Sequence, residues 1–123
     1  MLEPCVLAPV LAQPSLPLGR AAGLHISAEE LTQVKNRLDE EDLIVKAYRF
    51  SGDALCRAER FSAYQSALGD RFCGKVLADE SARQDTGMAP HSVVTRHLID
   101  EDGELTRQAL DEIIAFFQSR LKA

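Results

Sequence analysis

The stretch "LIVKAYRFSGD" (residues 43–53) decides the fold that we expect for this chain. Its first part, Leu43–Phe50, has little polar alternation, which is typical of a strand buried on both faces of a parallel sheet. The run ends in Ser51, Gly52 and Asp53, which are common turn formers. Asp53 therefore has two interpretations. It is either a solvated turn residue or a catalytic acid at the carboxyl end of a parallel strand, where open α/β sheets build their sites.

Length and composition are those of an ordinary globular protein. The chain has 123 residues, of which 46% are hydrophobic and 27% charged, and this length predicts one domain over residues 1–123. The net charge of −5 and the absence of tryptophan disfavour nucleic acid and anionic membrane surfaces as partners. The apolar N-terminal stretch has no basic leader and is too short to span a bilayer, so we expect a cytoplasmic protein.

The cysteines do not form a metal motif. Cys5, Cys56 and Cys73 have no C-x-x-C spacing and no Cys/His cluster around them, so a zinc site is disfavoured. We interpret them as buried free thiols in a reducing compartment. No motif points to a cofactor, and we expect neither a cofactor nor a metal.

Strand and helix signals alternate along the chain. In chain order we expect a strand over Val6–Ala12 interrupted by Pro9, a helix from the capping box Ser27–Glu30 to about Asp39, the strand Leu43–Phe50, a helix over Cys56–Leu68 ended by Gly69, a strand over Phe72–Ala78 and a helix from near Leu105. Strands joined by crossover helices pair in parallel. The sequence therefore predicts an α/β fold: a small three-layer parallel sheet of about three strands, flanked by helices.

Other polar residues have simple interpretations. The acidic run over residues 39–42 is expected to be a solvated loop between helix and strand. His25 and His97 have no partner pattern, so we assign them surface or helix-end roles. Arg57 and Arg60 are expected at solvated positions on the second helix.

A second polar residue joins Asp53 at the expected carboxyl edge of the sheet. His91, in Pro90-His91-Ser92, follows the third strand after a long polar loop. A carboxylate at that edge can hold an imidazole Nδ1–H, fix its tautomer and stabilise the imidazolium. In α/β hydrolases the catalytic residues follow the chain order nucleophile, acid, histidine. The sequence therefore predicts Asp53 and His91 as an acid and base on one edge of the sheet, not necessarily in contact.

The stretches "PVLAQPSLPLG", "DLIVKAYRFSGDALCRAERFSAYQSALGDRF" and "PHSVVTRHLIDEDGELTRQALDEIIAFF" together resemble the C-terminal half of the dienelactone-hydrolase branch of the α/β-hydrolase superfamily. The resemblance implies that Asp53 is the triad acid, that His91 is the triad histidine, and that the substrate is a small ester or lactone. It also implies a Ser or Cys nucleophile in G-x-S-x-G or G-x-C-x-G, and this sequence contains neither. Arg57 and Arg60 would meet a substrate carboxylate in such a family.

Two function classes stay open. The first is the C-terminal part of an ester or lactone hydrolase, inactive as an isolated chain, because an acid–base pair without a nucleophile has nothing to activate. Ser51, Ser92 and Cys56 are the conceivable substitute nucleophiles. The second is a stand-alone binding or assembly protein on a degenerate hydrolase scaffold. In either case an unpaired first strand predicts a homodimer, with that strand or its adjacent helices at the interface.

Overall fold

A parallel sheet lies at the centre of the computed structural model, which describes residues 1–122. Strands β1 (Val10–Ala12), β2 (Val45–Phe50) and β3 (Phe72–Leu77) are all parallel, in the order β1-β2-β3. The register aligns Val10 with Lys46 and Val45 with Phe72. The α/β fold class and the small parallel sheet expected from the sequence are thereby confirmed.

The helices follow the strands as crossover connections. Helix α1 (Ala28–Glu40) leads from β1 to β2, α2 (Ala58–Leu68) leads from β2 to β3, and α3 (Leu105–Leu121) closes the described chain. Single 3₁₀ turns, η1 (Gly69–Arg71) and η2 (Asp79–Ser81), flank β3. The predicted capping box of α1 is present, since Ser27 Oγ accepts from Glu30 N–H and Glu30 accepts from Ser27 N–H.

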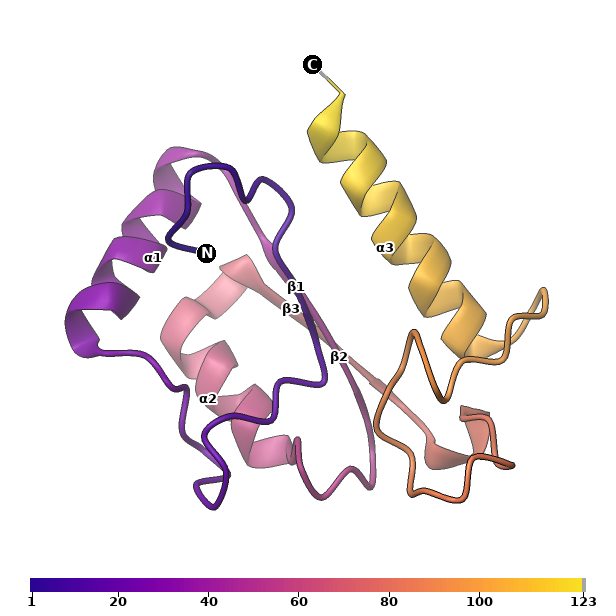
Figure 1. Ribbon diagram of the computed structural model, residues 1–123. Helices are drawn as coiled ribbons and strands as arrows, with labels where there is room; N and C mark the ends of the chain where they lie inside the picture. The colour runs from indigo at the N-terminus through magenta and orange to yellow at the C-terminus, as the bar shows by residue number, and fades with distance from the viewer. Residues whose placement is uncertain (123) are drawn as a thin grey trace.

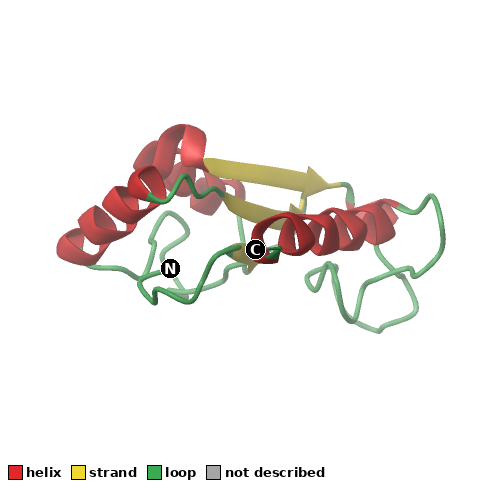
Figure 2. Ribbon diagram, turned by 90° about the horizontal axis from the view of Figure 1, so that it is seen from above, coloured by secondary structure: helices red, strands yellow, loops and turns green. Residues whose placement is uncertain are grey.

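Two apolar clusters cover opposite faces of the sheet, because side chains alternate along β2. Val45 and Ala47 pack with α1 and α2 in one cluster. Tyr48 and Phe50 pack with Leu77 and with the Ala109 region of α3 in the other. Figure 1 shows α1 and α2 on one side of the strands and α3 on the other, and Figure 2 shows the same layers from above. The expected three layers are therefore present.

The N-terminal segment departs from the expected strand. Strand β1 begins only at Val10, because the main chain before it folds against Arg37 of α1. The Arg37 guanidinium donates to the carbonyl oxygens of Met1, Glu3, Pro4 and Val6. Because these carbonyl groups all point to one guanidinium, the main chain that carries them curves around Arg37 and does not form an extended strand.

The acidic run is more structured than the predicted solvated loop. Helix α1 continues to Glu40, and Arg71 bridges the run with a 3.1 Å contact to Asp39 and a 2.7 Å contact to Asp42. Glu41 pairs with Arg37 at 2.9 Å. Unlike charges on neighbouring elements therefore hold the turn into β2.

Candidate functional site

Asp53 lies at the carboxyl end of the central strand β2, with its side chain only 2% exposed. Its Oδ1 accepts hydrogen bonds from Leu55 N–H at 2.9 Å and Cys56 N–H at 3.3 Å. These bonds fix the carboxylate relative to the loop that leads into α2. The interpretation of Asp53 as a solvated turn residue is therefore wrong, although Ser51 and Gly52 do form a turn.

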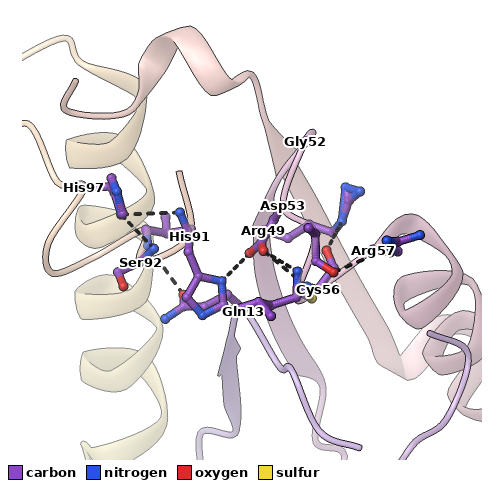
Figure 3. A network of polar contacts seen from close by, with 12 residues as sticks. Gln13, Arg49, Gly52, Asp53, Cys56, Arg57, His91, Ser92 and His97 are labelled. Atoms are coloured by element: carbon purple, nitrogen blue, oxygen red, sulfur yellow. Dashed lines mark hydrogen bonds and ion pairs between the residues drawn. The ribbon is translucent and has the colours of Figure 1, made fainter. Parts of the chain in front are cut away.

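His91 lies directly against the other oxygen of this carboxylate. The distance from His91 Nδ1 to Asp53 Oδ2 is 2.5 Å, and the His91 side chain is 22% exposed (Figure 3). A carboxylate only accepts, so His91 Nδ1–H donates, and in the neutral imidazole the lone pair is then on Nε2. The two residues share one edge of the sheet, as expected, and they are in contact.

The turn that delivers Asp53 is tied to the next strand. Asp79, two residues after the end of β3, accepts from Gly52 N–H at 2.9 Å, and its carboxylate also lies 3.4 Å from Ser51 Oγ. Ser51 N–H donates to Leu77 O at 2.8 Å, so the turn extends the β2–β3 ladder. Asp79 was not singled out from the sequence, where it appears as one more acid in a polar loop.

Gln13 is a second residue that sequence reasoning missed. It follows β1 with a φ of 44°, and its side-chain Oε1 accepts from Val93 N–H at 3.4 Å. Figure 3 shows Gln13 beside His91. The loop that carries His91 therefore lies next to the end of β1. Gln13 and Val93, which make this contact, are far apart in the sequence.

His97 is fully buried in the loop between β3 and α3, so the predicted surface or helix-end role is wrong. The ring packs edge to face with Phe50, with centroids 6.2 Å apart. Its Nδ1 lies 3.3 Å from His91 N and 3.0 Å from Ser92 N, and Nε2 lies 3.1 Å from Thr86 Oγ1. A sequence search for partner side chains fails here, because two of these partners are main-chain amides.

Arg60 is also buried, which contradicts its predicted solvated position. Its guanidinium donates to the carbonyl oxygens of Leu16, Pro17 and Gly23, and its Nε has no hydrogen-bond partner. The residue thus anchors the loop between β1 and α1. Arg57 is exposed, as expected.

Two cavities lie next to the Asp53 turn. One of about 340 Å³ is lined by residues that include Arg49, Asp53 and Arg57. Another of about 310 Å³ is lined by residues that include Leu18, Leu55 and Arg57. His91 lines neither of them, so neither cavity presents a substrate to its Nε2.

The three substitute nucleophiles are not arranged for attack. Cys56 is fully buried, and burial, followed by the charge of Asp53, raises the pKa of its thiol to about 11. It therefore stays protonated at neutral pH. The Ser51 hydroxyl faces Asp79. Within residues 1–122, none of the hydroxyls or thiols of Ser51, Ser92 and Cys56 forms a hydrogen bond with the His91 ring.

The predicted burial of all three thiols is only partly right. Cys5 and Cys73 are exposed, and all three cysteines are free. Cys73 is accessible because β3 is an edge strand of the sheet.

Over the described residues there is no group of three or more His, Cys, Asp or Glu side chains placed to hold a metal ion. No helix in residues 1–122 has the length and apolarity needed to cross a membrane.

Comparisons with protein-family models, with curated proteins and with solved structures found no match to this chain.

Proposed function

We propose that this chain is the acid–base half of an ester or lactone hydrolase of the dienelactone-hydrolase type. The observation that carries the proposal is the 2.5 Å contact between His91 Nδ1 and Asp53 Oδ2 at the carboxyl edge of a parallel sheet. A buried acid follows the central strand and a part-exposed histidine follows the next strand. This is the chain order and edge that the hydrolase resemblance implies.

The chemistry of the pair is general acid–base catalysis. Asp53 orients the imidazole and stabilises the imidazolium form, so that His91 Nε2 removes a proton from a Ser or Cys nucleophile. His91 then returns the proton to the leaving alcohol. The pair accelerates nothing without that nucleophile and without donors for the oxyanion.

The free edge of β1 supports a docking place for the segment with the nucleophile. Pro9 O accepts from Lys46 N–H, and Gln13 N–H donates to Tyr48 O, so these groups face β2. By the alternation of a parallel strand, the N–H and C=O groups of Val10 and Ala12 point to the opposite side. A parallel strand added there would end next to Gln13, which lies beside His91. A G-x-S-x-G or G-x-C-x-G turn after that strand would put its nucleophile near His91 Nε2.

A decisive test is complementation by such a segment. We expect the chain alone to show negligible hydrolysis of p-nitrophenyl acetate. A fusion behind the N-terminal half of a dienelactone hydrolase, ending after its nucleophile turn and helix, should hydrolyse the ester. Replacing His91 by Ala or Asp53 by Asn should lower that activity by about 10³–10⁴-fold. His25→Ala is the matched control. A folded fusion with no activity would argue against the proposal, as would turnover by the chain alone that His91→Ala abolishes.

A second candidate is an assembly protein without catalysis, and an exposed apolar stripe on α3 favours it. Ile114, Phe117 and Leu121 lie on one side of this helix, with exposed fractions of 43%, 38% and 62%. The apolar stripe on α3 and the free edge of β1 would together suit a homodimer. Its twofold axis would pair the two β1 strands antiparallel. The unpaired thiols fit the cytoplasmic location expected from the sequence. A stable monomer in light scattering at micromolar concentration would exclude this homodimer.

A further inference from the structure

The buried side chain of His97 forms hydrogen bonds with the loop around His91. Its ring nitrogens reach the amides of His91 and Ser92 and the hydroxyl of Thr86. Its own main chain adds two bonds, His97 N–H to Ser92 O at 3.0 Å and Arg83 N–H to His97 O at 2.9 Å. One fully buried residue therefore links both ends of the loop that presents the base.

The hydrogen-bond pattern fixes the tautomer of this ring. The amides of His91 and Ser92 can only donate, so Nδ1 of His97 must be the unprotonated acceptor. In the neutral imidazole the proton is then on Nε2, which donates to Thr86 Oγ1. The Thr86 hydroxyl donates a hydrogen bond to Met88 O at 3.2 Å and accepts one from Met88 N–H at 3.3 Å. Every donor in this chain of bonds meets an acceptor.

We propose that His97 is a positioning residue, whose neutral Nδ1 acceptor holds the main chain at His91 so that the His91 ring meets Asp53. The inference rests on the proposed acid–base function of the Asp53–His91 pair. The His91 side chain is part-exposed, and within residues 1–122 its one side-chain hydrogen bond goes to Asp53. Its direction is therefore set by the backbone that carries it, and two consecutive amides of that backbone are held by His97.

The same contacts distinguish positioning from simple filling of space. His97→Phe keeps an aromatic ring against Phe50 but removes the acceptor. His97→Asn is smaller, yet its Oδ1 can occupy the place of Nδ1 and accept the same two amides. If only volume matters, Phe is the better replacement. If the acceptor matters, Asn is.

The test is the tautomer of His91 in the full chain, read by nitrogen NMR of labelled histidine at about pH 9, where ordinary imidazoles are neutral. In the wild-type chain we expect one tautomer of His91, with the proton on Nδ1. His97→Phe should give an averaged mixture of both tautomers, and His97→Asn should restore the single form. A single Nδ1–H form in a folded His97→Phe chain, or averaging in His97→Asn as complete as in His97→Phe, would overturn the inference.

Hydrogen exchange of the wild-type chain supplies a measurement that needs no variant. The amides of His91 and Ser92 should exchange at least about tenfold more slowly than those of exposed loop residues. Free exchange of both amides would refute the role of His97 even if the variants fail to fold. Asp53→Asn separates the two proposals. It should disturb the tautomer of His91 and leave amide protection intact, and an undisturbed tautomer would count against the acid–base function instead.

Discussion

The Asp79 carboxylate closes over Gly52 and leaves no room for a side chain at that position. Asp79 Oδ1 accepts from Gly52 N–H at 2.9 Å, and a Cβ added at Gly52 would lie 2.2 Å from Asp79 Oδ2. The turn before Asp53 is therefore built from a residue without a side chain and an acid from the neighbouring strand end. This arrangement explains why Gly and not another turn former precedes the buried acid.

Gly52→Ala should destabilise the fold by about 0.5–1.5 kcal/mol, because the Asp79 carboxylate must move away and release the Gly52 amide. Urea unfolding measures the change. Asp79→Ala removes the clash together with the bond, so the alanine at position 52 should cost less in that background. The double-mutant cycle should give a coupling of about 0.5–3 kcal/mol. Strict additivity of the two substitutions would show that the contact is unimportant.

Arg60→Ala should cost about 2–4 kcal/mol of unfolding free energy, because three main-chain carbonyls lose their donor. The loop between β1 and α1 should become sensitive to limited proteolysis at the same time. Arg57→Ala, at the exposed N-cap position just before the same helix, is the control and should change stability by no more than about 0.5 kcal/mol, because the Arg57 side chain makes no capping bond. Arg60→Lys should recover only part of the loss, since an ammonium lacks the planar fork. Equal effects at positions 57 and 60 would contradict the anchoring role.

The thiols should react in two classes with Ellman's reagent. Cys5 and Cys73 are exposed and should react in the native chain, whereas Cys56 is buried with a pKa raised to about 11 and should react only after unfolding. Cys73→Ser should remove one of the fast-reacting groups, and Cys56→Ala should leave the native reaction unchanged. Rapid labelling of all three thiols without denaturant would show that Cys56 is accessible and would reopen its role as a nucleophile.

Glu112 should contribute to stability in a pH-dependent way. Burial raises the pKa of its carboxyl, but the Lys75 ammonium at 2.6 Å, with help from Tyr48, outweighs burial and holds the pKa below the ordinary value of 4.5. Because the pKa of Glu112 is lower in the folded than in the unfolded chain, its ionised form stabilises the fold at pH values above the unfolded-state pKa. This contribution is lost as the pH falls through the folded-state pKa. The contribution is at most about 1 kcal/mol, because the side chain is 40% exposed and solvent screens the pair.

Glu112→Gln should therefore be less stable than the wild-type chain at neutral pH, and the difference should shrink as pH falls below about 4.5. Urea unfolding at several pH values measures this. Glu101→Gln, at an exposed position, is the control and should show no such dependence. A difference that stays constant with pH would show that the charge of Glu112 does not contribute to stability.

Local patterns made part of the fold predictable from sequence. The capping box before α1 and the apolar run of β2 depend on neighbours in the chain, so both elements lie where the sequence places them. Asp53 and His91 could be paired because parallel strands end at a common edge. The boundaries of β1 were less predictable, since the segment before Val10 is shaped by Arg37, a residue of the following helix.

Arg60 and His97 were missed for a common physical reason. Their partners are main-chain carbonyls and amides, which every residue carries and which leave no signature in the sequence. One signal was available for Arg60, since it lies one helical turn before Tyr64 on the apolar face of α2. No comparable signal exists for His97. The path of the loop alone decides which of the two histidines is buried.

Both oxygens of the Asp53 carboxylate accept hydrogen bonds, and this has a consequence for how the sequence would evolve. One oxygen of its carboxylate orders the loop into α2 through Leu55 and Cys56, and only the other serves His91. Selection for a folded chain therefore retains Asp53 whether or not a reaction takes place. His91 is part-exposed and has no comparable structural duty, so purifying selection on it would come from chemistry alone. In a lineage that had abandoned catalysis, replacements would accumulate at His91 well before they reached Asp53.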